Sequence, residues 1–251
     1  MTQTTIRTVE FNNGHVVELI HNPSSLDFSD LPKELERAEA KYWDSFNKHC
    51  TAEQIRAIRK LVAVEKKMME PQRVTYVLAR TGAGKKITGH LIVYDGDSSL
   101  GGNDKLPLEM CFPHLRSRLR RGNKLVFEVK RAVTWPEGGG KCSFEDLLKG
   151  AVYHICGLKE IHPRNARIYG HTVNPETTAL YQKKYHAGII AGPELTSAEN
   201  EYLIDYHIAP LLAEYKDDFP PRNSFEGRRR SFEELLMDIR QPGAQSLPFY
   251  G

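Results

Sequence analysis

The feature that most constrains the fold is the succession of elements between residues 124 and 185. A strongly β-prone run at 125–135 leads into a glycine cluster. We expect a helix, a second strand and a short helix to follow, at 143–157, 166–173 and 174–185. Apolar residues recur at helical spacing in the first of these helices, so one of its faces should pack on a sheet.

The N-terminal part excludes a fold of strictly alternating strands and helices. An Asn-Asn-Gly turn predicts a β-hairpin over residues 5–20. Apolar periodicity then predicts two successive helices, at 31–46 and 51–70, before two further strands at 73–80 and 86–94. The chain is therefore expected to be α/β in the broad sense (α+β), with a mixed sheet.

Composition limits the classes of function. The 251 residues are 40% apolar and carry a formal net charge of +3, which supports a real core and gives no strongly basic nucleic-acid-binding tail. No apolar run has the length of a membrane span, and we expect a cytoplasmic protein. Four scattered cysteines form no CxxC pair, and no metal site is expected; they are Cys50, Cys111, Cys142 and Cys156.

The glycine cluster leads directly into a helix N-terminus. Ser143 and Asp146 have the spacing of a capping box. Glycines let a backbone approach a phosphate, and the free N–H groups of a helix start attract an anion. These residues are candidates for donor binding, with a plain surface turn as the alternative: Gly138, Gly139, Gly140 and Lys141.

A basic run lies between residues 116 and 124. Its charged members are Arg116, Arg118, Arg120, Arg121 and Lys124. Such a run is either a solvated face or a docking surface for an acidic partner or a phosphate. Both interpretations remain open at the level of sequence.

The central strand raises a question of parity. Alternate residues of a regular strand face opposite sides, so Glu128 and Arg131 should point apart. They can share one site only if a β-bulge shifts the register by one residue. Glu128 is then either an exposed strand carboxylate, or a general base or anchor for an amine.

The last helix of this region begins at a clear signal. Asn174 is a good N-cap and Pro175 suits the first helical position. Tyr181 lies two turns further on. Its phenol either packs in the core or donates a proton to a leaving thiolate.

These features resemble the GNAT superfamily of N-acyltransferases. The spacing of Asn174, Tyr181 and Lys183 after a strand is similar to that of the superfamily's final helix. Residues 110–115 and 127–133 further resemble the acyl-homoserine-lactone (autoinducer) synthases and the related N-acyl amino acid synthases. The Glu and Arg of their central-strand motif match Glu128 and Arg131, whereas their Trp, Ser and Phe are replaced by Phe127, Lys130 and Ala132.

The resemblance implies a GNAT-like acyltransferase fold with a mixed, mostly antiparallel central sheet, a bulged and splayed strand pair, and flanking helices. It implies an acyltransferase domain at 1–198, and we expect residues 199–251 to form a C-terminal helical extension packed on it. The activity implied is N-acyl transfer from a thioester to the amine of a small acceptor, such as an amino acid derivative, within a ternary complex.

The resemblance also implies roles for individual residues. Backbone N–H groups near Ala132 and Val133 would polarise the thioester carbonyl, and Asn174 would approach the pantetheine arm. Glu128 would deprotonate the acceptor, directly or through water. Tyr181 would protonate the departing sulfur. Arg131 would order Glu128 or bind an acceptor carboxylate.

Two departures from the relatives bear on the substrates. The strand at 90–94 has no arginine where the autoinducer synthases carry one, which argues against homoserine lactone as product and leaves general acyl transfer intact. Residues 136–141 replace the usual phosphate-binding loop, which suits an acyl chain delivered by acyl carrier protein, docked on the basic run, with acyl-CoA still open as donor. The alternatives are an ordinary acetyl-CoA-dependent N-acetyltransferase and a catalytically silent binding module of the same fold.

Overall fold

The computed structural model describes residues 4–22, 70–80, 87–100, 105–122, 124–134, 143–172, 175–192 and 202–220, with isolated positions between 40 and 63. The helices expected at 31–46 and 51–70 therefore fall mostly outside the described residues. The glycine cluster and the tail after residue 220 also lie outside them.

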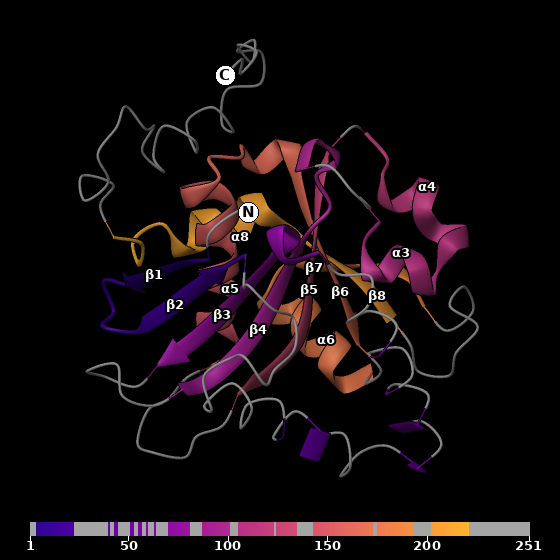
Figure 1. The fold of residues 1–251 in the computed structure, drawn as a ribbon, viewed down its shortest axis with the longest axis horizontal. Helices are drawn as coiled ribbons and strands as arrows, with labels where there is room; N and C mark the ends of the chain where they lie inside the picture. Colours follow the sequence, from indigo (N-terminus) through magenta and orange to yellow (C-terminus); the bar gives the residue numbers. More distant parts are fainter. Residues whose placement is uncertain are drawn as a thin grey trace.

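The described chain is built on one eight-stranded sheet with the order β1-β2-β3-β4-β5-β6-β8-β7 (Figure 1). Its strands are β1 Thr5–Glu10, β2 Val16–His21, β3 Val74–Arg80, β4 Ile87–Asp95, β5 Leu125–Thr134, β6 Ala166–Thr172, β7 Ala187–Ala191 and β8 Tyr202–Tyr206. Every neighbouring pair is antiparallel except β5 and β6, which run parallel. The expected mixed, mostly antiparallel sheet is confirmed.

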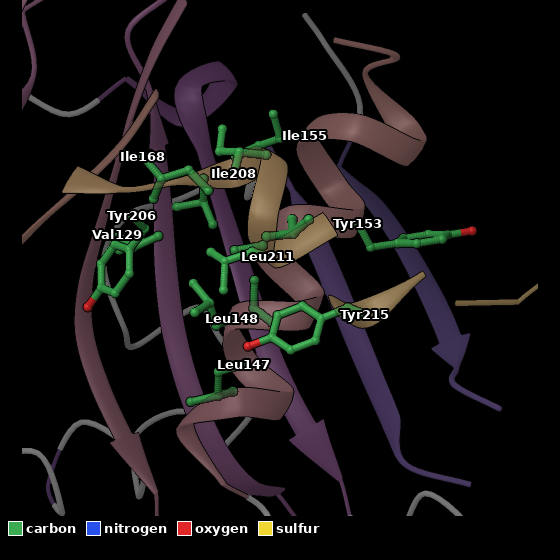
Figure 2. Packing of buried hydrophobic residues seen from close by; sticks show 14 of the residues in the cluster. Val129, Leu147, Leu148, Tyr153, Ile155, Ile168, Tyr206, Ile208, Leu211 and Tyr215 are labelled. Atoms are coloured by element: carbon green, nitrogen blue, oxygen red, sulfur yellow. The ribbon is translucent and has the colours of Figure 1, made fainter. Parts of the chain in front are cut away.

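One face of the sheet is covered by α5, Phe144–Val152, and α8, Ile208–Tyr215. Leucines of both helices, including Leu148 and Leu211, pack against sheet residues such as Val129 (Figure 2). The N-terminus of α5 has the predicted cap: the Asp146 carboxylate accepts hydrogen bonds from the Ser143 backbone N–H at 2.9 Å and hydroxyl at 3.1 Å. Past Val152 the helix continues as a π-helix, Tyr153–Leu158, so it ends at Leu158 rather than at Gly157.

The other face is covered by short helices, α3 Pro107–Cys111, a 3₁₀ turn Pro113–Leu115 and α4 Arg116–Leu119. Their leucines bury tyrosines of the sheet, Tyr76 and Tyr94 among them. The helix α6, Pro175–Lys184, connects β6 to β7. Short 3₁₀ turns lie at Pro71–Arg73, Ser98–Leu100 and Pro163–Asn165. Among the described helices, none is long and apolar enough to cross a lipid bilayer.

The stretch 199–215 differs from the helical extension expected from the sequence. Tyr202–Tyr206 is strand β8, which lies between β6 and β7 and is hydrogen-bonded to both. Pro210 falls in the first turn of α8, where its missing N–H has no intrahelical partner to lose. Residues 202–215 are therefore part of the sheet and its core, while residues 199–201 and 221–251 of the expected extension lie outside the described residues.

Gly150 sets how closely α5 approaches the sheet. A Cβ at this position would come within 2.5 Å of Val77 Cγ1 and 3.5 Å of Val17 Cγ2. Non-bonded carbon atoms are normally much further apart than 2.5 Å, and the Val77 side chain cannot easily rotate away because valine is stiff at χ1. The absence of a side chain at Gly150 therefore lets the helix lie directly on β2 and β3.

We predict that Gly150→Ala lowers the free energy of unfolding by about 1–2 kcal/mol, because overpacking outweighs alanine's helix propensity of about 1 kcal/mol. Urea denaturation measures the change. In a Val77→Ala background the clashing methyl group is gone, and the same substitution should be neutral or stabilising. An equal loss in both backgrounds would show that close packing on Val77 is not the reason for the glycine.

Candidate active site

The parallel pair β5–β6 comes apart partway along its length. The strands are paired from Leu125 with Ala166 to Val129 with Gly170, and the pairing stops there. β5 continues to Thr134 and β6 to Thr172. We call residues 130–134 of β5 and 171–172 of β6 the splayed ends. Within the described residues, the β5–β6 ladder includes no pair beyond Val129 and Gly170, so the ladder itself does not engage the backbone of the splayed ends.

A β-bulge lies at the start of the splayed ends. Across the β4–β5 ladder Ile92 pairs with Lys130, but His90 pairs with Val133. One residue of β4, Leu91, is therefore opposite two residues of β5. Arg131, in the bulge, has a φ of 52°, in the left-handed region, which costs a non-glycine residue about 1–3 kcal/mol.

The bulge confirms the register shift that the parity argument required. Ala132 packs with the α5-side core together with Val129. In a regular strand, residues three apart face opposite sides. The shift therefore exchanges the two faces of β5 for every residue beyond Arg131.

Glu128 is buried, with 3% of its surface exposed, and its carboxylate is engaged. Oε2 accepts a hydrogen bond of 2.8 Å from the backbone N–H of Leu108, at the start of α3. Oε1 lies 3.4 Å from Lys130 Nζ. Glu128 pairs with Tyr169 across the ladder, so it lies just before the splayed ends. Its observed contacts fasten α3 to the central strand.

His90, which the sequence analysis did not single out, lies beside the bulge. Its ring is fully buried and stacks on Tyr76, with 5.7 Å between ring centroids. Burial, and then the positive charge of Arg131, lower the pKa of His90 to about 3, so the ring is neutral. The Arg131 backbone carbonyl favours the protonated ring but lies outside hydrogen-bond geometry.

Neither ring nitrogen of His90 has a hydrogen-bond partner among the described residues. A buried polar group left without a partner costs about 1–3 kcal/mol. The signal in the sequence was a single imidazole within a mostly apolar strand. That signal is weak because most such histidines are satisfied core residues.

Tyr181 lies on the other face of the sheet, against α5. Its ring stacks on Phe144, with 4.8 Å between centroids and 15° between planes, and lies 5.8 Å from the rings of Tyr185 and Tyr206. Burial, with a smaller contribution from Tyr185, raises the pKa of Tyr181 to about 12. The phenol therefore keeps its proton and can donate a hydrogen bond.

Other predicted donor-binding residues are only partly described. Ala132 and Val133 directly follow Arg131, where the bulge alters the register, and are half-buried. Gly138, Gly139, Gly140, Lys141 and Asn174 lie outside the described residues.

The structure divides the basic run between interior and surface. Arg120 donates two hydrogen bonds to Glu109, at 2.6 and 2.7 Å, and one to the Gly96 carbonyl at 2.8 Å. Arg120 therefore holds the α3–α4 segment together. Arg118 and Arg121 are exposed, as is Arg116, whose Nε is 3.7 Å from Glu109. Lys124 is half-buried at the start of β5.

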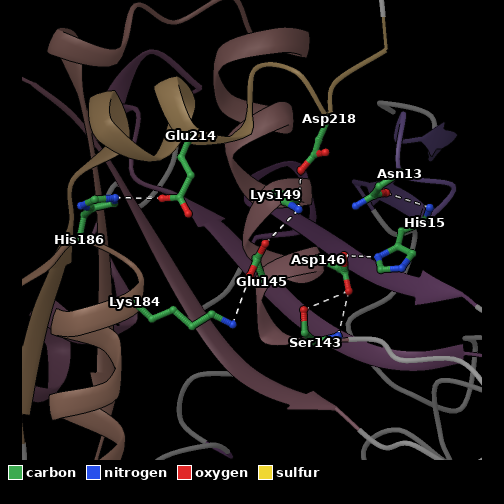
Figure 3. A network of polar contacts seen from close by, with 10 residues as sticks. All are labelled: Asn13, His15, Ser143, Glu145, Asp146, Lys149, Lys184, His186, Glu214 and Asp218. Carbon is green, nitrogen blue, oxygen red and sulfur yellow. Dashed lines mark hydrogen bonds and ion pairs between the residues drawn. The ribbon is translucent and has the colours of Figure 1, made fainter.

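A polar network fixes the first turns of α5 (Figure 3). Lys149, nearly buried, contacts Asp218 at 2.6 Å and Glu145 at 3.1 Å. Glu145 also contacts Lys184 of α6 at 3.2 Å. Burial alone would lower the pKa of Lys149, but the hydrogen bonds to Asp218 and Glu145 raise it. The network thus ties α5 to α6, which carries Tyr181.

No group of three His, Cys, Asp or Glu residues that could hold a metal ion occurs among the described residues. The chemical groups at or next to the splayed ends are the guanidinium of Arg131, the neutral imidazole of His90 and the carboxylate of Glu128. The phenol of Tyr181 belongs to α6 on the opposite face, where its ring packs on Phe144 and Tyr206. Such a set can bind an anionic group and move protons.

We predict that two buried histidines make the protein less stable in acid. The pKa values of His90 and His154 are lowered to about 3, mainly by burial, against 6.5 for an ordinary histidine. Below pH 6.5 the unfolded chain binds protons that the folded chain does not. Each histidine should therefore remove up to ~1.4 kcal/mol of stability per pH unit as the pH falls from 6.5 towards 3.

Urea denaturation at several pH values between 7 and 4 tests this prediction. The stability of the His90→Phe, His154→Gln double variant should rise relative to the wild type as the pH falls. Stability curves that stay parallel over this range would contradict it.

Searches with the sequence gave no match to a family model and no match to a curated protein. Solved structures do match the fold. FeeM, an N-acyl amino acid synthase from uncultured soil microbes, is 13% identical with a TM-score of 0.51, over 83% of this chain and 94% of that one. Apo FdhC, a nucleotide-linked sugar GNAT, is 9% identical with a TM-score of 0.48, over 86% and 100% of the two chains.

The AHL synthase LasI also matches, at 12% identity and a TM-score of 0.36, over 62% of this chain and 73% of that one. Identities this low show a shared fold and not a shared substrate. The match to FeeM extends over nearly the whole of that protein. The chain has the fold of the GNAT N-acyltransferases.

Proposed function

We propose that this chain transfers an acyl group from a thioester, carried by coenzyme A or by an acyl carrier protein, to the amine of a small acceptor. The observation that carries the proposal is the parting of β5 from β6 directly beside a bulge in β5. This arrangement leaves backbone N–H groups in the sheet without ladder partners, with proton-carrying side chains on both faces. The fold shared with FeeM supports the same reaction class.

The thioester would lie between the splayed ends. Its carbonyl oxygen would accept hydrogen bonds from N–H groups near Ala132 and Val133, which stabilise the negative charge of the tetrahedral intermediate. The acceptor nitrogen attacks the carbonyl carbon, the C–N bond forms and the C–S bond breaks. Holding donor and acceptor together supplies part of the rate.

The reaction takes a proton from the amine and builds negative charge on the departing sulfur. Glu128 lies one residue pair before the ladder ends, so we propose that it takes the amine proton through an intervening water. Tyr181 would donate a hydrogen bond to the sulfur as negative charge builds on it. Because the pKa of Tyr181 is about 12 and that of an ordinary thiol is about 8.5, stabilisation of the sulfur is favoured over full proton transfer.

Arg131 points to the class of acceptor. It is a cation with 6% of its surface exposed, held at a fixed place by the bulge. A guanidinium binds a carboxylate in a bidentate manner and repels a second cation. We propose an acceptor with a carboxylate near its amine, such as an α-amino acid. The name of FeeM, an N-acyl amino acid synthase, is in line with this.

The exposed arginines suggest how the donor arrives. Arg116, Arg118 and Arg121 present positive charge on the side of the sheet covered by α3 and α4. This surface suits an acidic acyl carrier protein, whereas Arg120 is committed to Glu109. A cytoplasmic location, where acyl thioesters are made, fits either donor.

One observation favours a second candidate, a catalytically silent module of the same fold. The Glu128 carboxylate already caps α3 and contacts Lys130. In a silent module these contacts would be the whole role of Glu128. An ordinary acetyl-CoA-dependent N-acetyltransferase is the remaining alternative. A preference for acetyl-CoA over long-chain donors would distinguish it from the proposed enzyme.

The test is product mass after incubation with acetyl-CoA, long-chain acyl-CoA or long-chain acyl carrier protein. Acceptors should be L-amino acids, each paired with its decarboxylated amine, such as phenylalanine with phenethylamine. We expect N-acyl amino acid from a long-chain donor. We also expect a preference for the amino acid over its amine of about 10-fold or more, lost in Arg131→Gln. No product from any pair would contradict the proposal.

We predict that Glu128→Gln lowers kcat by about 10²-fold while the melting temperature changes little, because the amide oxygen still accepts from Leu108. Glu128→Ala should also lose stability, by about 1–3 kcal/mol, since that N–H is left unpaired. Full activity of Glu128→Gln would show that Glu128 only caps α3 and takes no part in the reaction.

We predict further that Tyr181→Phe lowers kcat by about 10-fold or more, because the departing sulfur loses a hydrogen bond worth about 1.5–3 kcal/mol. Tyr185→Phe is the matched control, since both rings belong to one aromatic cluster on the end of α6. Steady-state kinetics with a saturating donor measures both. Equal effects of the two substitutions would assign Tyr181 to packing alone.

A further inference from the structure

His90 is exceptional among the buried histidines of the described chain. His154 is similarly enclosed, yet its Nε2 lies 3.2 Å from the Thr75 hydroxyl. His90 has no such contact at either ring nitrogen within the described residues. Burial therefore does not by itself explain an unpartnered imidazole. A polar group buried at this cost is expected to have a partner in the working state of the protein.

The position of His90 indicates what that partner is. His90 pairs with Val133, which is a residue of the splayed ends. The positive charge of Arg131, in the bulge, acts on the His90 ring. On the same face of β4 follow Ile92 and Tyr94, which face Lys130 and Glu128 of β5. His90 is thus on the face of the sheet that carries Lys130 and Glu128, and it lies near enough to Arg131 of the bulge for that charge to act on its ring.

The charges facing His90 restrict the chemical form of a ligand. Arg131 contributes positive charge from β5. Lys130, further along the same strand, lies 3.4 Å from the Glu128 carboxylate, which offsets its charge. Tyr76 of β3 covers the ring with an uncharged aromatic face. A neutral imidazole offers one N–H donor and one acceptor nitrogen. Beside Arg131 it should bind an uncharged amine more readily than an ammonium ion.

We propose that His90 binds the acceptor directly, its acceptor nitrogen receiving an N–H of the neutral amine while Arg131 holds the acceptor's carboxylate. The inference rests on the proposed function and deepens it, because it assigns the contact that aims the nucleophile. The lone pair of the amine then remains free to attack the thioester carbon. His90 does not take the proton, since the imidazole is held neutral and is a weak base where it lies.

The experiment compares His90→Phe, His90→Asn and the control His154→Gln, with a long-chain acyl donor and phenylalanine as acceptor. For His90→Phe we expect kcat/KM for the acceptor to fall about 10-fold or more, with KM for the donor within about twofold of wild type. His90→Asn keeps a hydrogen-bonding group and should recover part of the loss. His154→Gln should leave both constants unchanged.

The melting temperature separates the two roles of His90. Removing a histidine with a purely structural role should lower the melting temperature, whereas removing one that binds the acceptor should not. Replacing an unpartnered buried imidazole by an apolar ring should leave the melting temperature of His90→Phe equal to or above that of wild type. A lower melting temperature together with unchanged acceptor constants would show a structural histidine and overturn the inference. If His90→Phe does not fold, the acceptor kcat/KM of His90→Asn decides, and an unchanged value overturns it.

The outcomes for the inference and for the proposed function are distinct. A wild-type chain that makes no product with any donor and acceptor overturns both. A wild-type chain that is active, with His90→Phe equally efficient towards the acceptor, overturns only the role of His90. A loss that appears in KM for the donor instead would place His90 on the thioester and overturn its assignment to the acceptor.

Discussion

The structure depends on one break in backbone hydrogen bonding, the point where β5 leaves β6 after Val129 and Gly170. The bulge next to it places Arg131 in a left-handed conformation that costs free energy, so the surrounding packing must hold it there. Together these two departures end the β5–β6 ladder inside the sheet, so the backbone groups beyond it are not engaged by that ladder. Buried backbone groups that leave a ladder are paired in other ways, by side chains, water or a ligand.

Helices on both faces of the sheet hold β5 and β6 in place where the ladder between them ends. α5 makes the crossover between the parallel strands and lies directly on the sheet at Gly150. On the other face the Glu128 carboxylate holds α3, and Arg120 holds Glu109 of the same helix. Several charged side chains thus maintain the strand arrangement. This explains why residues that look catalytic in sequence also have structural contacts.

The features that could be predicted from the sequence are those set by local residue patterns and by the alternation of side chains along a strand. The β5 run, the cap of α5 and the need for a bulge between Glu128 and Arg131 all follow from spacing. β8 is not evident from the sequence because residues 199–215 form one amphipathic pattern, whereas Tyr202–Tyr206 becomes a strand by insertion between β6 and β7. Neither the inward turn of Arg120 nor the unpartnered state of His90 is visible in sequence, since both depend on tertiary neighbours.

The central claim is that the splayed ends of β5 and β6 receive the acyl donor. Amide chemical-shift mapping with a thioether analogue of long-chain acyl-CoA, which binds but cannot transfer, tests it most directly. We expect the largest shifts on residues 130–134 and 171–172 and on Tyr181, with no change in the distant hairpin β1–β2. Shifts concentrated elsewhere in the sheet, with none at the splayed ends, would contradict it.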